Sequence, residues 1–113
     1  MIVLKTKKKK VTYAIGIDLG GTFIKSAIVN SNGKIVKQFK CESRSNISPK
    51  KVTEQIGKCI LKLKKGFGKE LLGIGIGAPG IVTNGIVKYP PNFWNWKEVK
   101  LRDHFEKKFK MET

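Results

Sequence analysis

Apolar and polar residues alternate along the first part of the chain, which is typical of strands with one buried face. The alternation predicts three strands, over residues 11–19, 23–29 and 35–41. Residues 30–33 separate the last two and read Asn-Ser-Asn-Gly. This is a strong turn signal, because Asn and Gly tolerate positive φ. We therefore expect an antiparallel three-strand meander.

A helical pattern follows the meander. Ser48 and Pro49 are residue types that favour an N-cap and the first helical position. Apolar residues then recur at helical spacing, which places them on one stripe of a helix. The stripe consists of Val52, Ile56, Cys59, Ile60 and Leu63. Gly66 and Gly68 are expected to end the helix, since glycine is favoured just past a helix C-terminus.

The second half of the chain predicts one buried strand, a long irregular stretch and a final helix. The strand covers residues 71–77 (Leu-Leu-Gly-Ile-Gly-Ile-Gly). A loop rich in turn formers follows at 78–85, then a short extended piece at 86–88 and an irregular aromatic segment at 89–96. A helix is expected over about residues 97–109. The resulting element order is that of an α/β fold.

The turn after the first strand carries candidate chemistry. Asp18 offers a hard oxygen to Mg²⁺ or to one of its waters. Gly20 and Gly21 allow the backbone to turn sharply and bring its N–H groups close to an anion. Thr22 adds a hydroxyl, so the pattern suits a metal-bound polyphosphate. The alternative is a Gly-Gly hairpin with an incidental Asp.

The aromatic segment allows two interpretations. Sugar rings pack their C–H faces on aromatic side chains, and their hydroxyls need partners such as the amide of Asn92. Alternatively, Trp94 and Trp96 form a hydrophobic plug that covers the sheet. The sequence leaves both open.

The net charge of the 113 residues is +16, and five of the lysines lie at positions 5–10. Basic domains attract nucleic acids. The aromatic residues do not interleave with the lysines, however, as base stacking would require, and no helix-turn-helix pattern precedes the first strand. We interpret the lysines as a solvated face and expect no nucleic-acid partner. The length allows one small domain.

Cys41 and Cys59 stand 18 positions apart, without another Cys or a His close in sequence. This spacing fits neither a zinc site nor a disulfide framework, so two free thiols in a reducing cytosol are expected. His104 lies in a lysine-rich segment and is expected at the surface. No stretch approaches the roughly 20 apolar residues of a membrane span. We expect a cytoplasmic protein without a membrane partner.

Two motifs carry a resemblance to a known family. Residues 18–22 (Asp-Leu-Gly-Gly-Thr) resemble the first phosphate motif of the actin/hexokinase superfamily. Residues 73–82 (Gly-Ile-Gly-Ile-Gly-Ala-Pro-Gly-Ile-Val), followed by Gly-Ile-Val at 85–87 and Pro-Asn ending at Asn92, are similar to the ROK family, above all to its bacterial glucokinases. The resemblance implies a ribonuclease-H-like (actin-like ATPase) lobe over residues 11–113, preceded by a basic leader at 1–10.

The resemblance implies transfer of the ATP γ-phosphoryl group to a sugar hydroxyl, with glucose or a related hexose as substrate. Asp18 would contact Mg²⁺ through water. The implied phosphate-binding residues are Gly20, Gly21 and Thr22, and the implied sugar-binding residues are Gly80, Ile81 and Asn92. Phosphoryl transfer depends chiefly on positioning and charge neutralisation, which such groups supply.

The family also carries parts that are not found up to Thr113. They are an Asn-Asp-x-Asn motif whose Asp is the general base, a Glu-x-Gly-His sugar motif, a Cys-rich zinc site and an adenosine pocket. No residue of this chain is therefore assigned as the catalytic base, and the chain by itself is expected to be inactive. A structural zinc would belong to the missing C-terminal part. The full-length protein is expected to be a homodimer.

Two other functions stay open. A ROK-type sugar-responsive transcriptional regulator would need a DNA-binding helix-turn-helix, for which the ten residues before Val11 leave no space. A non-catalytic half-domain would bind sugar or nucleotide without turnover, by pairing with another chain.

Overall fold

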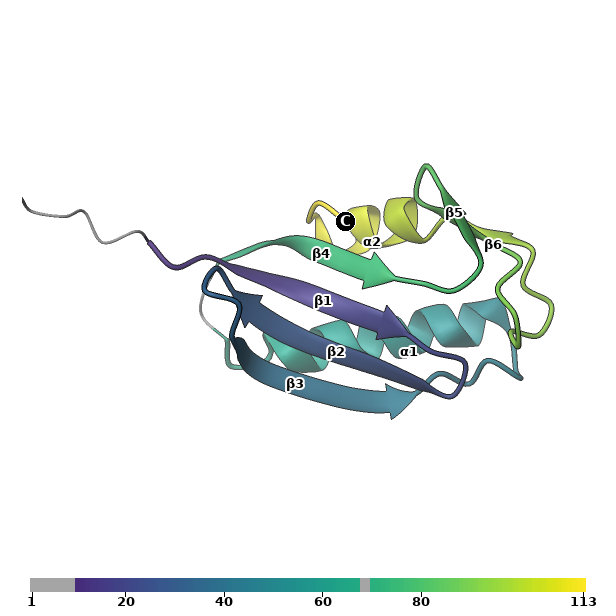
Figure 1. Ribbon diagram of the computed structural model, residues 1–113, viewed down its shortest axis with the longest axis horizontal. Coiled ribbons are helices and arrows are strands. Elements are labelled where there is room, and N and C mark those ends of the chain that lie inside the picture. The colour runs from purple at the N-terminus through teal and green to yellow at the C-terminus, as the bar shows by residue number, and fades with distance from the viewer. Residues whose placement is uncertain (1–9, 68–69) are drawn as a thin grey trace, which may run out of the picture.

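A mixed sheet forms the centre of the molecule, for which we use a computed structural model that describes residues 10–67 and 70–113. The strands are β1 (Tyr13–Leu19), β2 (Phe23–Asn30), β3 (Ile35–Glu42) and β4 (Leu71–Gly77). They lie in the order β3-β2-β1-β4 (Figure 1). The three-strand antiparallel meander is confirmed, and β4 runs parallel to β1. Apart from Lys10, the expected leader lies outside the described residues.

The helix α1 (Pro49–Lys64) packs against one face of this sheet, as Figure 1 shows. The Ser48 hydroxyl accepts a hydrogen bond from the Lys51 N–H at 3.0 Å, so the predicted N-cap is confirmed. The predicted apolar stripe is buried against the sheet. Gly66 follows the helix with φ +69°, a conformation that favours glycine. Gly68 lies outside the described residues.

The segment between β4 and the last helix has more regular structure than predicted, although the short extended piece expected at residues 86–88 is confirmed. It contains β5 (Ile81–Thr83) and β6 (Ile86–Lys88), which form a small antiparallel sheet with β7 (Glu98–Val99). The helix α2 (Leu101–Phe109) therefore begins four residues later than the predicted start at residue 97. Residues 98 and 99 pair with β6 instead of entering the helix, and these strands are too short to show a periodic pattern.

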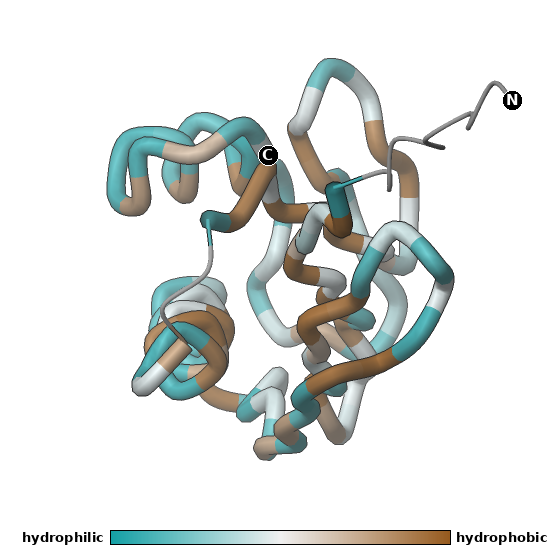
Figure 2. The backbone as a smooth tube through the Cα atoms, turned by 90° about the vertical axis from the view of Figure 1, so that its left-hand side faces the viewer, coloured by the Kyte–Doolittle hydropathy of each residue, from teal (hydrophilic) through white to brown (hydrophobic). Residues whose placement is uncertain are grey.

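One apolar core joins the two halves of the chain. It lies between the sheet and α1 and continues under the second half, where Phe93, Trp96 and Phe105 are buried. Hydrophobic residues, brown in Figure 2, follow the strands at the centre of the molecule. Of the described helices, none is long and apolar enough to cross a membrane.

Candidate functional site

The two motifs meet at one edge of the main sheet. Because β1 and β4 are parallel, both end at this edge, and open α/β sheets bind ligands at the carboxyl ends of their strands. Asp18 lies opposite Gly77 in the register of this strand pair. Residues 20–22, which we call the Gly-Gly turn, follow the end of β1, and residues 78–81 follow Gly77. Segments far apart in sequence are thus neighbours.

The Gly-Gly turn connects β1 to β2 and requires glycine at its first position. The Gly20 N–H donates to the Phe23 carbonyl at 3.0 Å, which closes the turn. A Cβ atom on Gly20 would lie 2.7 Å from that same carbonyl oxygen, too close for a side chain. Thr22 is exposed, so its hydroxyl is available to a ligand. The sharp backbone and the hydroxyl suit an anion.

Two serines that the sequence analysis missed hold this turn from behind. The hydroxyls of Ser43 and Ser45 donate to the carbonyls of Gly20 and Gly21, respectively, and the Ser43 N–H donates to the Thr22 carbonyl at 2.8 Å. Both serines are buried. Their position directly after a predicted strand, in alternation with polar residues, was the only signal in the sequence.

A shallow cavity of about 300 Å³ opens beside the Gly-Gly turn. Thr22, Ser45 and Arg44 are among the residues that line it. The Arg44 guanidinium lies 3.5 Å from the Glu42 carboxylate, and both side chains are largely exposed. Arg44 was not among the predicted site residues, and the Glu42 carboxylate lines the same cavity, so the two charges offset each other.

Residues 89–96, which we call the aromatic loop, lie against the Gly-Gly turn. The Trp94 N–H donates to the Ser45 carbonyl at 2.9 Å, so the serine that holds the turn also holds the loop. A Cβ atom on Gly21 would lie 3.8 Å from the Asn92 Cβ, within van der Waals distance. Asn92 is exposed and has a left-handed backbone with φ +66°. The predicted phosphate and sugar residues therefore adjoin.

Gly80 lies between the main sheet and the aromatic loop. Its φ of +85° favours glycine, and a Cβ atom there would lie 2.6 Å from the Lys88 carbonyl oxygen and 2.9 Å from the Pro90 Cα. The next residue, Ile81, begins β5 and is exposed. Gly80 thus brings the backbone of residues 80–81 close to the start of the aromatic loop.

The two tryptophans have different environments. Trp96 is 4% exposed, its indole N–H donates to the Val87 carbonyl at 3.0 Å, and its ring contacts Phe93 edge to face. The plug interpretation therefore holds for Trp96. Trp94 is 61% exposed, so its ring remains available for stacking. The buried side chains of Phe93 and Trp96 anchor the loop in the core, and the exposed ring of Trp94 lies between them in the sequence.

Asp18 is the metal candidate at this edge. It is exposed at the carboxyl end of β1, and no cluster of three or more His, Cys, Asp or Glu side chains that could hold a metal occurs among the described residues. A single carboxylate beside an anion-binding turn fits Mg²⁺, which keeps several waters and takes its other oxygens from substrate phosphates. It does not fit an ion held by protein ligands alone.

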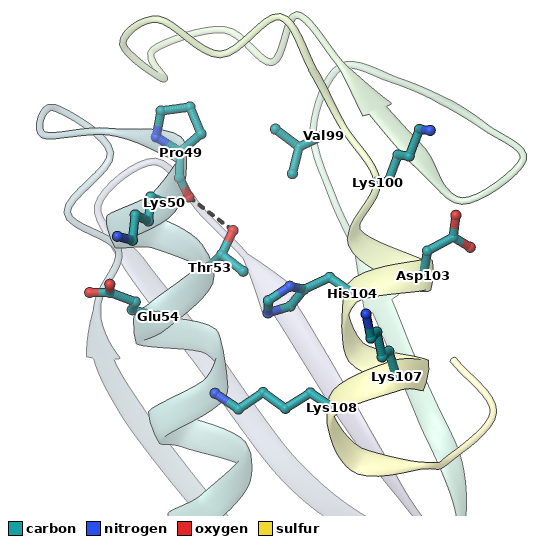
Figure 3. A pocket seen from close by; sticks show the side chains of 10 residues that line it. All are labelled: Pro49, Lys50, Thr53, Glu54, Val99, Lys100, Asp103, His104, Lys107 and Lys108. Carbon is teal, nitrogen blue, oxygen red and sulfur yellow. Dashed lines mark hydrogen bonds between the residues drawn. The ribbon is translucent and has the colours of Figure 1, made fainter.

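A second cavity, of about 540 Å³, lies between α1 and α2 (Figure 3). None of the predicted site residues lines it. His104 points into it from α2 and is exposed, so the expectation of a surface histidine is confirmed. The Asp103 carboxylate also lines this cavity.

Comparison with known proteins gives a consistent result. The family model described as the ROK family matches residues 14–113. A glucokinase from Thermotoga maritima is 36% identical over 96 residues, which make up 83% of this chain and 30% of that protein. A xylose repressor from Caldicellulosiruptor bescii is 33% identical over 114 aligned positions, covering 96% of this chain and 28% of the repressor.

The solved structures agree. A ROK family glucokinase from Streptomyces griseus, crystallised with glucose and AMPPNP, superposes with a TM-score of 0.78 at 26% identity over 88% of this chain. The actin-like ATPase fold expected from the motifs is confirmed by this similarity. The chain spans about 30% of the length of these relatives. Because the family model covers nearly all described residues, both motifs included, the chain belongs to the ROK family.

Proposed function

We propose that this chain is the N-terminal lobe of an ATP-dependent sugar kinase that resembles glucokinase. The observation that carries the proposal is the contact between the Gly-Gly turn and the aromatic loop, since a Cβ on Gly21 would touch Asn92. Phosphoryl transfer requires the phosphate donor and the accepting hydroxyl to lie next to each other. A phosphate-binding turn beside a sugar-binding side chain meets this requirement.

In this proposal the chain positions both substrates. Gly20 and Gly21 bind ATP phosphate through their backbone, and Thr22 binds it through its hydroxyl. The Asp18 carboxylate would hold Mg²⁺ through water, and the ion would supply charge neutralisation at the phosphates. The sugar is held by the backbone of residues 80–81 and by the Asn92 amide, which pairs with a hydroxyl. Trp94 offers an exposed ring to a C–H face.

The proposal assigns no general base within the 113 residues. Asp103 lies on α2 and lines the cavity between the helices, which none of the predicted site residues lines. A positioned base contributes about 10²–10⁴-fold to the rate. We therefore expect the 113 residues alone to bind without efficient turnover, and activity to require the remainder of a full-length kinase.

The similarity to a xylose repressor supports a second candidate function. That alignment covers 96% of the chain, against 83% for the glucokinase. In a sugar-responsive regulator the same aromatic loop would bind the sugar, and no phosphate would be transferred. A non-catalytic half-domain that pairs with another chain would likewise bind without turnover. Phosphoryl transfer to a sugar separates the kinase from both.

The test uses the longest native product that carries these 113 residues. Sugar-dependent release of ADP from ATP is measured with a panel of hexoses, for the native protein and for Asp18→Asn and Asp103→Asn. We expect Asp18→Asn to reduce kcat by at least about 100-fold with little change in sugar affinity, because only the charge toward the metal is lost. Asp103→Asn is the matched control and should retain full activity. Equal activity of all three proteins would show that Asp18 does not act at the metal site. Sugar binding without ADP release in the native protein would favour the regulator over the kinase.

A further inference from the structure

Cys41 on β3 and Cys59 on α1 form a contact that their spacing in the sequence hides. Their Sγ atoms lie 2.7 Å apart, a contact that the sequence analysis did not anticipate, and both are free thiols, as expected. The cause is the packing of α1 on the sheet, which places the predicted apolar stripe, Cys59 included, against β3. Cys59 is fully buried, whereas Cys41 is partly exposed.

We propose that Cys41 and Cys59 are an oxidisable dithiol, which a peroxide converts to a disulfide that joins β3 to α1. The two sulfur atoms are already in contact, and an S–S bond of ~2.05 Å needs only a small approach of β3 and α1. Two elements already in contact can make so small a movement without unfolding. The inference does not depend on the proposed kinase function.

The reaction has two steps. The Cys41 thiolate attacks one oxygen of hydrogen peroxide, the O–O bond breaks, and Cys41 becomes a sulfenic acid while the other oxygen leaves as water. The Cys59 sulfur then attacks the Cys41 sulfur, the S–O bond breaks and a second water leaves. The protons of both thiols end in water. Overall, two thiols are oxidised by two electrons and one peroxide is reduced to two waters.

The order of the steps follows from burial. Peroxide must come from solvent, and of the two sulfurs only that of Cys41 belongs to a partly exposed residue. Burial raises the pKa of Cys59 to about 12, and its hydrogen bond and charge interaction with Cys41 act in the same direction. Cys59 is therefore a thiol at neutral pH and a poor first nucleophile. It serves as the resolving residue.

The disulfide would lie directly behind the Gly-Gly turn. Cys41 is two residues before Ser43, whose hydroxyl donates to Gly20 and whose N–H donates to Thr22. The Gln55 side-chain amide already donates from α1 to the Glu42 carbonyl at 2.9 Å, in the same short segment. A covalent link between β3 and α1 would therefore restrain the strand end that supports the turn. Oxidation is expected to slow amide exchange at Ser43 several-fold.

The test treats the reduced full chain with an equimolar amount of hydrogen peroxide, then with N-ethylmaleimide, and measures the intact mass. We expect a loss of two hydrogens, no maleimide adducts, a peptide that links Cys41 to Cys59, and recovery of two adducts after dithiothreitol. The Tm of the oxidised chain should rise by roughly 5–15 °C, because the cross-link restricts the unfolded state. Two adducts after peroxide, or cross-links only between separate chains, would overturn the proposal.

Two variants check the order of the steps. In Cys59→Ala the Cys41 sulfenic acid has no resolving partner and should be trapped by dimedone. In Cys41→Ser the buried Cys59 should stay reduced at the same peroxide dose. Circular dichroism spectra matching those of the parent chain show that each variant is folded. Dimedone labelling of Cys59 in Cys41→Ser, or none at Cys41 in Cys59→Ala, contradicts the assigned roles.

Discussion

The Gly-Gly turn and the aromatic loop lie side by side at one edge of the sheet, but different forces hold them. The turn is held by hydrogen bonds, from its own Gly20 N–H and from two buried serines behind it. The loop is held by two buried aromatic side chains, Phe93 and Trp96, that extend into the apolar core. A backbone hydrogen bond from Trp94 to Ser45 links the loop to the serine whose hydroxyl holds Gly21.

Because of this difference, the loop anchors contribute mainly to the stability of the fold, whereas the hydrogen bonds of the turn fix the positions of its backbone groups. Hydrogen bonds are directional, so those at the Gly-Gly turn fix the position of each backbone group while its outer side stays open to solvent. Burial of aromatic rings is strong but less directional, so the anchors fasten the loop and leave Asn92 and Trp94 exposed between them. Substitutions of loop anchors should mainly lower the stability of the fold. Substitutions in the turn should mainly disturb phosphate binding.

The largest effect is expected for Trp96→Ala. The substitution removes a buried ring and leaves the Val87 carbonyl without its indole donor. We expect the free energy of unfolding to fall by roughly 3–5 kcal/mol, measured by urea denaturation. Trp94→Ala is the matched control in the same loop and should change it by less than about 0.5 kcal/mol. Similar losses in the two variants would show that the loop is not fastened by burial.

A smaller but still large effect is expected for Gly20→Ala. The new Cβ atom would lie 2.7 Å from the Phe23 carbonyl oxygen, so the turn must open. We expect a loss of about 1–3 kcal/mol in unfolding free energy and weaker binding of a nucleotide, measured by calorimetry. Gly16→Ala, on β1, is the control, since nothing lies within 4 Å of its added Cβ atom. If both variants bind nucleotide equally well, the turn does not require glycine at residue 20.

Ser43→Ala tests whether the turn depends on its support from β3. It removes the donor to the Gly20 carbonyl in a partly buried hydrogen bond, which should cost about 1–2 kcal/mol of unfolding free energy and reduce nucleotide affinity. The control is Ser31→Ala, which loses only an exposed hydrogen bond from the Thr12 N–H. Its effect should stay below about 0.5 kcal/mol. Unchanged nucleotide affinity in Ser43→Ala would mean that the turn holds its shape without the serine.

Most of the fold follows from local sequence patterns. The alternation before residue 42, the N-cap at Ser48 and the apolar stripe of α1 each depend on neighbours in sequence, and each prediction is confirmed. The start of α2 was predicted too early, because residues 98 and 99 pair with β6. The paired residues of β6 and β7 lie about ten positions apart in the sequence, and both strands are too short to show an alternation of apolar and polar residues.

The site was also predicted only in part, because contacts between distant segments leave no local pattern in the sequence. Asp18 and the Gly-Gly turn form a continuous motif, so their chemistry is visible in the sequence. Ser43 and Ser45 were missed because they meet the turn only after β3 pairs with β2 and brings the end of that strand back beside it. The contact of Cys41 with Cys59 depends in the same way on α1 crossing the sheet. Each missed contact is tertiary.

Asn92→Ala gives the smallest effect on stability and the sharpest test of the loop. Asn92 and Asn95 are both exposed asparagines with left-handed backbones, at φ +66° and +55°. Alanine tolerates this conformation less well than asparagine. Asn92→Ala and Asn95→Ala should therefore lose similar amounts of unfolding free energy, up to about 1 kcal/mol each.

Only Asn92→Ala should affect the sugar. Loss of one hydrogen bond to a sugar hydroxyl corresponds to about 1 kcal/mol, or roughly a fivefold higher sugar KM in the full-length protein. Because the pair shares its backbone strain, any difference in KM reports on the amide itself. An equal rise in both variants would assign the effect to the loop backbone. An unchanged sugar KM in both variants would show that the sugar does not bind at Asn92. The contact between the Gly-Gly turn and the aromatic loop would then no longer support phosphoryl transfer at this edge.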